Sequence, residues 1–255
     1  MTIDPALVAG YAKCDDCAVH HRALCRNANQ AAIAELNRIS HMRSFVRGQN
    51  IQGQGEEALI VGNVVSGVVR LSSASIDGSQ HIVGLLFPSD FFGRVYSESS
   101  RFSYEAATDV TVCCMQRTAF ERFLADHPEV EHELLIAKLD ELDAVREWNS
   151  IISGHTTTQR VATFLYVLAK RTRNQGCGNE RPSGQIIHIP ISRRDIAAYL
   201  GTTPETLSRN IQAMARRKVF RIVDAKHFEL LDESALVHHA GEAREDLENM
   251  VSVNR

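Results

Sequence analysis

Residues Ile191–Phe220, ISRRDIAAYLGTTPETLSRNIQAMARRKVF, carry the start and stop signals of two short helices joined by a tight turn. Ser192 followed three residues later by Asp195 resembles a capping box, which predicts the beginning of the first helix. Gly201 permits the turn, and Thr203, with a proline directly behind it, predicts the N-cap and first position of the second helix. This stretch therefore predicts a helix-turn-helix.

The predicted second helix has an apolar and a polar face. Its apolar residues recur at helical spacing and are expected to pack on the first helix: Leu207, Ile211 and Met214. The N-cap and the polar face supply the candidate DNA-binding residues: Thr203, Glu205, Ser208, Arg209 and Gln212. Arg209 can donate two hydrogen bonds to guanine, Glu205 can accept one from cytosine, and Ser208 can contact a base or a phosphate. The polar face is therefore suited to reading DNA.

A β-hairpin is predicted directly after the second helix. Val219–Val223 and His227–Leu231 are strand-like runs on either side of a turn at Asp224–Lys226. A pair of amphipathic surface helices is the alternative interpretation of the preceding stretch. Cap, turn, proline and hairpin together favour a winged helix-turn-helix, whose second helix enters the major groove of double-stranded DNA.

The basic residues of the chain are concentrated around this stretch. Residues 157–231 contain 13 Lys and Arg against 5 Asp and Glu, whereas the whole 255-residue chain has a net charge of −3. Residues 119–149 contain 3 Lys and Arg against 9 Asp and Glu, and residues 232–255 contain 2 against 6. One basic segment in an acidic chain indicates a polyanionic partner, although a solvated basic face would have the same composition.

Length and composition exclude several classes of protein. A content of 44% hydrophobic and 23% charged residues is typical of a globular chain with one large domain or two smaller ones. No apolar run approaches the roughly 18 residues of a membrane span, and the N-terminus lacks the basic region of a secretory signal. We therefore expect a cytoplasmic protein with reduced thiols and no membrane association. No catalytic grouping or phosphate-binding loop stands out, so an enzyme is not expected.

The chain from residue 28 to about 118 has the pattern of β-strands. Val64–Leu71 and Ile82–Phe87 are rich in β-branched residues, and Tyr104–Met115 predicts a further strand. Asp77–Gly78 lies between two such runs and predicts a hairpin with a type I′ turn, in which both central residues have positive φ. This part of the chain therefore predicts an antiparallel β-domain.

A long helix is predicted after it, over residues 129–155. Its apolar residues follow a three-and-four spacing with acidic residues between them: Leu135, Leu142, Val145 and Ile152. We call these four residues the α-helical stripe. The stripe could pack on the β-domain, but a helix of about 25 residues with a narrow apolar seam is typical of two subunits that pair side by side. We therefore expect a homodimer.

The order of β-domain, long helix and winged helix-turn-helix resembles the Crp/Fnr superfamily of bacterial transcription factors. GNVVSGVVRL at 62–71 and FPSDFFG at 87–93 are similar to its cyclic-nucleotide-binding-type β-roll, although Ser89 departs from the usual Pro-Gly-Asp. Glu205, Ser208 and Arg209 match the E-x-x-S-R signature of the Fnr branch. The resemblance implies an α+β fold, palindromic DNA with TTGAT-like half-sites read by these three residues, and RNA polymerase as a further partner.

Five segments are expected on this basis. They are an N-terminal cysteine arm (residues 1–27), a β-roll sensor domain (28–128), a dimerisation helix (129–155), a winged helix-turn-helix (156–237) and an acidic C-terminal tail (238–255).

The resemblance also allows a test for cyclic AMP. Receptors of this nucleotide use a Glu just after a Gly and an Arg-Ser pair on a short phosphate-binding helix. Here Arg94 follows Gly93, and Arg101 is followed by Phe102 rather than a serine. Loss of the carboxylate leaves the ribose hydroxyl of the ligand unpaired, at a typical cost of a few kcal/mol. Cyclic AMP is therefore not the expected ligand.

Three cysteines lie close together in KCDDCAVHHRALC, residues 13–25. Cys14 and Cys17 are placed to bind one metal centre, and Cys25 follows after seven intervening residues. A zinc site could take His20 or His21 as its fourth ligand. A lone redox pair would lie at a helix start after a strand, and no such pattern surrounds this one. An iron–sulfur cubane would require a fourth thiolate from elsewhere in the chain.

The strand at Val110–Cys114 supplies candidates for that fourth thiolate. Because side chains alternate along a strand, Cys114 points the same way as the valines, toward the core, whereas Cys113 points the other way. Cys113 is therefore the better ligand and Cys114 the better core residue. Cys177, in a Gly-rich loop, is interpreted as an incidental thiol.

Three N-terminal cysteines and one in the roll also resemble the arrangement of Fnr-type oxygen sensors. The C-x2-C-x7-C spacing is similar to that of the FnrN/FnrL group, and the single roll cysteine aligns best with Cys113. The resemblance implies a [4Fe–4S] cluster bound by Cys14, Cys17, Cys25 and Cys113, which oxygen destroys and on which the dimer depends. A zinc-stabilised regulator with another signal and an iron–sulfur electron carrier are the alternatives.

Overall fold

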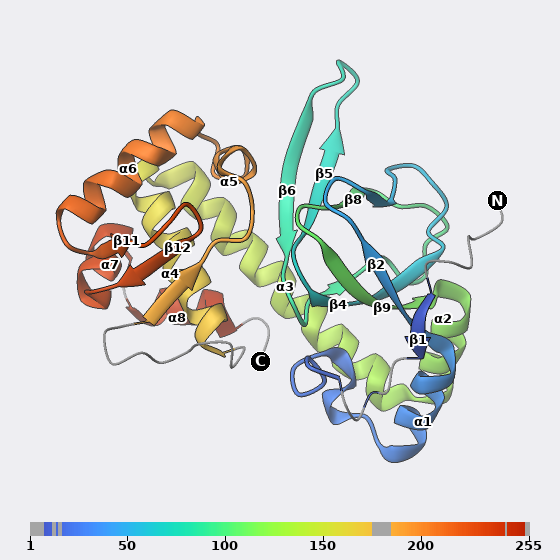
Figure 1. The fold of residues 1–255 in the computed structure, drawn as a ribbon. Coiled ribbons are helices and arrows are strands. Elements are labelled where there is room, and N and C mark those ends of the chain that lie inside the picture. The colour runs from blue at the N-terminus through green and yellow to red at the C-terminus, as the bar shows by residue number, and fades with distance from the viewer. Residues whose placement is uncertain (1–7, 12–13, 15–16, 175–184, 243, 253–255) are drawn as a thin grey trace. The chain divides into compact units, whose positions relative to one another are not determined.

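A computed structural model describes residues 8–11, 14, 17–174, 185–242 and 244–252 (Figure 1). The chain divides into two compact units, one that ends at Leu139 and one that begins at Asp140. The division falls inside the longest helix, α3 (Pro128–Gly154). The first unit is β-rich and the second contains a helix-turn-helix, so the predicted α+β class and order of elements are confirmed.

Two antiparallel sheets form the β-roll of the first unit. The first sheet contains, in spatial order, β1 (Val8–Tyr11), β2 (Ser40–Phe45), β9 (Val110–Gln116), β4 (Ile60–Ser66) and β7 (Phe91–Phe92). The second contains β3 (Asn50–Gln52), β8 (Ser103–Ala106), β5 (Val69–Ala74) and β6 (Gln80–Leu86). Inward-facing residues of both sheets fill the core between them: Phe45, Val64, Val69, Phe92, Ala106, Val110 and Val112. The predicted run Tyr104–Met115 is thus two strands, in different sheets.

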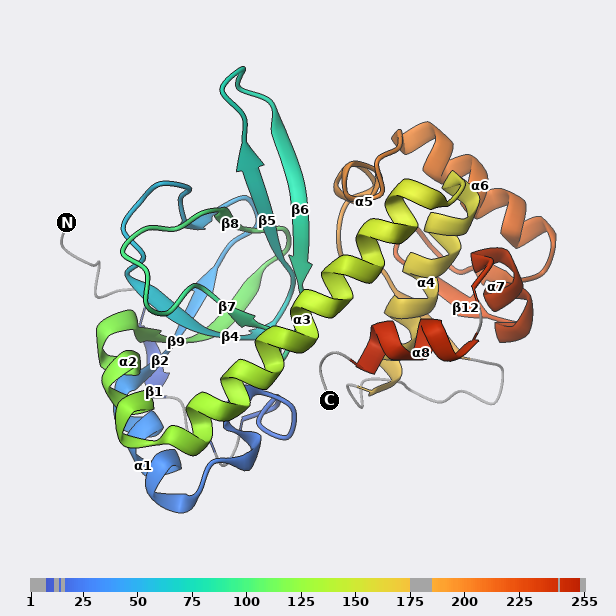
Figure 2. The same cartoon turned by 180° about the vertical axis from the view of Figure 1, so that it is seen from behind.

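Three helical segments accompany the roll, and sequence reasoning predicted none of them. They are η3 (Leu24–Asn27), α1 (Gln30–Ile39) and α2 (Arg117–Asp126). Figures 1 and 2 place α1 and α2 beside the first half of α3. A second apolar core lies among these helices and the first sheet, with Leu36, Val61, Phe120, Phe123 and Val130 among its members. The expectation of β-structure from residue 28 onward was therefore wrong for residues 30–39.

The hairpin between β5 and β6 has a different turn from the predicted one. Gly78 has a φ of +82°, but Asp77 is not among the residues with positive φ. The N–H of Gly78 donates to the carbonyl of Ser75 at 3.0 Å. This is the geometry of a type I turn followed by a left-handed glycine, which is the usual three-residue hairpin connection. The hairpin itself is confirmed, and the type I′ prediction is wrong.

The second unit contains the remainder of α3 and the helix-turn-helix with the elements packed around it. These are α4 (Thr157–Asn174), β10 (Gln185–His188), α5 (Arg193–Tyr199), α6 (Pro204–Arg216), β11 (Phe220–Ile222), β12 (His227–Leu230), α7 (Glu233–Ala240) and α8 (Arg244–Ser252). The three strands form one antiparallel sheet in the order β10-β12-β11. The predicted wing is confirmed as β11 and β12. Cys177 lies outside the described residues.

The segment predicted as an acidic tail contains a packed helix. In α8, Leu247 is fully buried and Met250 nearly so. Figure 2 shows α8 alongside α4 and α7. Arg244 at its start pairs with Glu233 of α7, which also accepts a hydrogen bond of 2.9 Å from Lys170. The acidic residues of α8 are thus the solvated face of an amphipathic helix, and the expectation of a tail is wrong for residues 244–252.

Candidate functional site

The caps predicted for the helix-turn-helix are confirmed. The Ser192 hydroxyl accepts a hydrogen bond of 3.1 Å from the N–H of Asp195 at the start of α5. The Thr203 hydroxyl accepts one of 3.2 Å from the N–H of Thr206, and Pro204 takes the first position of α6. Each cap satisfies a backbone donor that the helix leaves free, so both helices begin where the sequence indicated.

The two faces of α6 are divided as predicted. The apolar face is buried with Ile196 and Leu200 of the preceding helix: Leu207, Ile211 and Met214. On the polar face, Glu205, Arg209 and Gln212 are exposed and Ser208 is half-buried. The Thr206 hydroxyl contacts the Arg209 guanidinium at 3.1 Å. The structure therefore brings the five predicted DNA-binding residues onto one accessible side of α6.

Electrostatics favour an ionised carboxylate at the start of this face. The pKa of Glu205 is lowered by its own backbone N–H first, and then by the Thr203 hydroxyl and Arg209. An ionised carboxylate at a helix N-terminus is also stabilised by the helix dipole. Glu205 is therefore poised to accept hydrogen bonds, as contact with the amino group of cytosine requires.

Three polar residues that sequence reasoning missed hold α6 in place. The Thr158 hydroxyl donates to the side-chain oxygen of Asn210 at 2.6 Å, and the Asn210 amide donates to the Thr206 carbonyl at 2.9 Å. Arg160 donates to the carbonyl of Leu200 at 2.8 Å, just before the turn. These contacts anchor the recognition helix to α4. The threonines at the start of α4 are the one sequence feature that could have indicated these contacts.

The second half of α3 is anchored to α5 by aromatic stacking. The rings of Trp148 and Tyr199 are nearly parallel, with centroids 5.0 Å apart and an interplanar angle of 9°. Phe164 of α4 meets Tyr199 edge-on at 6.0 Å. Offset or edge-on aromatic pairs contribute about 0.5–1.5 kcal/mol beyond their buried area. The end of α3 and the first helix of the helix-turn-helix therefore belong to one packed body.

The two cysteines of β9 lie in different environments. Cys114 is buried, faces the roll core and contacts the carbonyl of His41 through its sulfur at 3.4 Å. Burial raises the pKa of Cys114, while Arg43 lowers it. Cys113 is half-buried on the opposite face of the strand, opposite Met42 of β2. The predicted alternation of the two side chains is confirmed.

The N-terminal arm is tied to α1 at its first cysteine. The backbone N–H of Cys14 donates to the side-chain oxygen of Asn37 at 2.8 Å. The Cys14 carbonyl then accepts from the N–H of Cys17 at 3.2 Å, and the Cys17 carbonyl accepts from His20 at 3.1 Å. Cys25 lies in the short helix η3. These turns fold the arm back so that its cysteines can face one region.

Electrostatic interactions show which thiols are neighbours. Burial first, and then the neighbouring Cys14, Cys17 and Cys113, together raise the pKa of Cys25 to about 12. Burial likewise raises the pKa of Cys113 to about 12; Ser40 acts in the opposite direction, and Cys14 and Cys17 contribute to the rise. The four cysteines predicted as ligands therefore converge, and we call them the cysteine site.

The surroundings of the cysteine site are apolar. Cys14 belongs to the second core, and Cys25 packs against that core together with Leu24, Ala28, Ile33 and Ile39. Within the described parts of the chain, no three His, Cys, Asp or Glu side chains are grouped as ligands of a single metal ion. His21 is exposed and His20 half-buried. Four converging thiols in a desolvated site are a soft donor set suited to iron–sulfur chemistry or to zinc.

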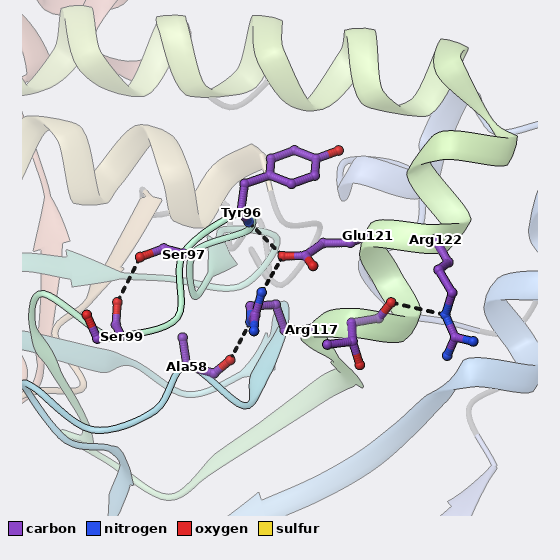
Figure 3. A network of polar contacts seen from close by, with 8 residues as sticks. Ala58, Tyr96, Ser97, Ser99, Arg117, Glu121 and Arg122 are labelled. Carbon is purple, nitrogen blue, oxygen red and sulfur yellow. Dashed lines mark hydrogen bonds and ion pairs between the residues drawn. The ribbon is translucent and has the colours of Figure 1, made fainter.

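The segment matched to the nucleotide pocket is held by a polar network (Figure 3). The Tyr96 N–H donates to Glu121 at 2.7 Å, and the Arg117 guanidinium donates to the same carboxylate at 2.7 Å. Arg117 also donates to the carbonyl of Ala58 at 2.8 Å. Residues 93–102 contain no helix, and Arg101 is exposed. The segment therefore lacks the helix that binds phosphate in cyclic-nucleotide receptors.

Ser89 occupies a glycine-like conformation at the entrance to the same segment. Its φ is +83°, in the left-handed region, where the usual Pro-Gly-Asp has its glycine. The carboxylate of Asp90 accepts from the N–H of Phe87 at 2.9 Å and closes the turn. Ser89 therefore adopts the left-handed conformation that a glycine would adopt at this position of the turn.

The α-helical stripe is largely uncovered within its units. Leu135, Leu142 and Val145 are 55%, 43% and 56% exposed, and Ile152 is half-buried. Leu139, which was not predicted as part of the stripe, is 52% exposed. Large apolar side chains repeated along one helix indicate a surface that another chain covers. None of the helices in the described part of the chain has the length and hydropathy of a transmembrane span.

Comparisons with known proteins agree with the two-unit structure. Residues 42–127 match the cyclic nucleotide-binding domain family, and residues 159–238 match the Crp-like helix-turn-helix domain family. The chain is 34% identical to the transcriptional activator protein FnrL of Cereibacter sphaeroides, over 90% of this chain and 92% of the relative. It is 30% identical to the nitrogen fixation regulation protein FixK of Bradyrhizobium diazoefficiens, over 82% and 86%.

A solved structure gives the same assignment. FixK2 from Bradyrhizobium japonicum superposes with a TM-score of 0.72 and 27% identity, covering 80% of this chain and 99% of that one. Regulators of this family are not enzymes, and the E-x-x-S-R signature lies on the exposed face of α6. The chain belongs to the Crp/Fnr family of DNA-binding transcription regulators.

Proposed function

We propose that the protein is an oxygen-responsive transcription regulator that binds DNA as a homodimer while a [4Fe–4S] cluster is intact. The observation that carries this proposal is the convergence of Cys14, Cys17, Cys25 and Cys113, three from the arm and one from β9. Four thiolates are the usual ligands of such a cluster, and their apolar surroundings limit the access of water. When bound, the cluster would supply a redox-active group that reacts with oxygen and is lost from the protein as a result.

The grouping of side chains among the described residues favours a cluster over zinc. A zinc–sulfur bond is about 2.3 Å, so one tetrahedral zinc ion would hold its sulfurs about 3.8 Å apart. The described residues include no such tight group of three ligands. A cubane holds its four thiolates farther apart than one ion does. This agrees with the cysteine site, whose thiols are neighbours but do not form a single-ion ligand group among the described residues.

The cysteine site is connected to the start of α3. Cys14 shares the second apolar core with Val130 and Leu134 of α3. Outside this core, Arg26 lies 3.8 Å from Glu133, and Asn29 donates to Glu129 at 2.8 Å. A ligand that fixes the arm would therefore also fix the first turns of α3, while loss of the ligand would release both.

This connection gives the signal a route to the dimer. Regulators of the family are dimeric, and the exposed α-helical stripe continues along the helix whose start the arm contacts. Acidic side chains flank the stripe, so two copies of α3 repel one another: Glu131, Glu133, Asp140, Glu141, Asp143 and Glu147. A monomer–dimer equilibrium balanced in this way can be shifted by a few kcal/mol of packing at the cysteine site.

In the dimer, two copies of α6 would read a palindrome. TTGAT-like half-sites require contacts to guanine, cytosine and adenine–thymine pairs, for which Glu205, Ser208 and Arg209 are chemically suited. Two relatives are named as transcriptional activators, one of them as probable, which supports activation by this protein. The proposal includes RNA polymerase as a partner and the cytoplasm as the location.

Cyclic AMP is not the signal in this proposal. The ribose-binding carboxylate is replaced by Arg94, and Glu121 and Arg117 hold the segment that would bind phosphate. Isothermal titration should therefore detect no cyclic-AMP binding in the micromolar range. Binding in that range would overturn this part of the proposal.

The matched variants Cys113→Ser and Cys114→Ser test the ligand assignment. Each protein is purified without air, reconstituted with iron and sulfide, and assayed for bound iron and sulfide. We expect Cys113→Ser to lose the cluster and Cys114→Ser to retain it, because only Cys113 faces the arm. Retention by Cys113→Ser, or zinc in place of iron in the wild-type protein, would contradict the proposal.

A further inference from the structure

Ser40 is a buried polar residue next to the cysteine site. It is 1% exposed and lies where α1 ends and β2 begins. Its backbone N–H donates to the carbonyl of Leu36. Its hydroxyl, by contrast, meets no nitrogen or oxygen partner among the described residues. Burying a hydroxyl without a hydrogen-bond partner lowers the stability of the fold, so a functional role would explain its retention here.

The strand register directs this hydroxyl toward Cys113. Ser40 lies opposite Met115, and Met42 lies opposite Cys113. Because side chains alternate, Ser40 and Cys113 project from the same face as diagonal neighbours, close enough for side chains to meet.

We propose that the Ser40 hydroxyl donates a hydrogen bond to the thiolate of Cys113 and thereby stabilises the bound cluster. This inference rests on the proposed function and adds a positioning residue to its site. A donor to a metal-bound thiolate withdraws charge from the sulfur, which raises the reduction potential of an iron–sulfur cluster. Burial strengthens the contact, because water cannot replace the donor when the hydroxyl is removed.

A purely structural role for Ser40 predicts a different outcome. The hydroxyl makes no hydrogen bond to nitrogen or oxygen in the described structure, so Ser40→Ala removes no such bond. The metal-free variant should therefore unfold at the same temperature as the wild-type protein or a higher one. The effect of the substitution should be confined to the metal-bound state.

The first test compares Ser40→Ala with Ser44→Ala, an exposed serine on the same strand. Both variants and the wild-type protein are reconstituted with iron and sulfide without air. We expect Ser40→Ala to lose its visible absorbance in air about 10-fold faster than the wild-type protein, in line with other outer-shell substitutions. Its midpoint potential should be lower, while Ser44→Ala should match the wild-type protein in both measurements.

A second measurement separates failure of this inference from failure of the proposed function. Cobalt(II) binds thiolates directly, and its sulfur-to-cobalt charge-transfer band moves to lower energy when a thiolate loses a hydrogen bond. A wild-type protein that takes up cobalt but no iron–sulfur cluster would refute the proposed function and still test Ser40. Equal band positions and equal bleaching rates in wild-type and Ser40→Ala proteins would overturn the inference. Uptake of neither metal would overturn both.

Discussion

The side-chain amide of Asn29 donates a hydrogen bond of 2.8 Å to the carboxylate of Glu129, which lies in the first turn of α3. The side-chain oxygen of the same Asn29 accepts from the N–H of Ala32 and caps α1. One residue thus joins the end of the cysteine arm, the start of α1 and the start of α3. It provides a defined point at which the state of the arm can affect α3.

Asn29→Ala and Asn29→Ser separate the two contacts of this residue. Serine remains a good N-cap, whereas alanine removes the cap and should lower the free energy of unfolding by about 1 kcal/mol. Both variants lose the amide that contacts Glu129. We expect both to dimerise more weakly than the wild-type protein when loaded with the cluster. Urea unfolding and sedimentation measure the two effects, and Gln30→Ala serves as control. Wild-type dimerisation by Asn29→Ser would disprove the coupling.

Gly62 is required for the position of Cys113. A Cβ atom at residue 62 would lie 2.0 Å from the carbonyl oxygen of Cys113, whereas one at Gly84 would meet Leu71 at 3.7 Å. We expect Gly62→Ala to displace β9, lower the free energy of unfolding by about 1–3 kcal/mol and reduce iron retention. Gly84→Ala should leave iron retention unchanged. Iron content after reconstitution is the measurement, and full retention by Gly62→Ala would show that Cys113 is dispensable.

Arg209 and Lys218 should contribute to DNA binding in different ways. Arg209→Ala removes the proposed contact with guanine and should cost about 1–3 kcal/mol on a TTGAT palindrome, with relaxed specificity at that base. Lys218, exposed after the end of α6, is suited to a phosphate. Lys218→Ala should weaken binding to all sequences alike. It should also reduce the slope of the logarithm of the binding constant against the logarithm of the salt concentration by about one. Fluorescence anisotropy at several salt concentrations distinguishes these patterns, and equal losses on specific and random DNA for Arg209→Ala would refute base reading.

Asp140 tests the balance of charge along α3. Asp143 pairs with Arg146 at 2.9 Å, so its removal would also free a cation, which makes Asp140→Asn the cleaner variant. Removal of one repulsive pair near 4 Å in water contributes about 1 kcal/mol, or about fivefold in the dimer dissociation constant. We expect Asp140→Asn to dimerise measurably in air. Sedimentation should show this shift, with Asp126→Asn on α2 as control, and a purely monomeric Asp140→Asn would argue against charge repulsion.

The sequence predicted the helix-turn-helix more completely than any other part of the fold. Its signals are local: Ser192 and Thr203 each cap a helix through the residue three positions on, and Gly201 has the left-handed φ of +60° that its turn needs. The helices α1 and α8 were missed for the opposite reason. Their apolar faces are short, and residues such as Leu247 are buried only because residues distant in the chain pack against them.

The candidate site shows the same division between local and distant information. Alternation along β9 was enough to separate Cys113 from Cys114, because it depends on one strand alone. The convergence of β9 with the arm had to come from the family resemblance or the structure. Ser40 and Asn37 could not be found from sequence, since each acts on a cysteine more than 20 residues away. The turn at Asp77 was mistaken because an Asp-Gly pair fits two hairpin geometries.

The central claim is that an oxygen-labile cluster at the cysteine site controls DNA binding. The most direct test is an absorbance spectrum of the protein purified without air, recorded before and after exposure to air, with DNA binding measured on the same samples. We predict a broad visible band typical of [4Fe–4S] that disappears in air together with specific binding to a TTGAT palindrome. A colourless protein that binds this DNA equally well with and without air would contradict the claim.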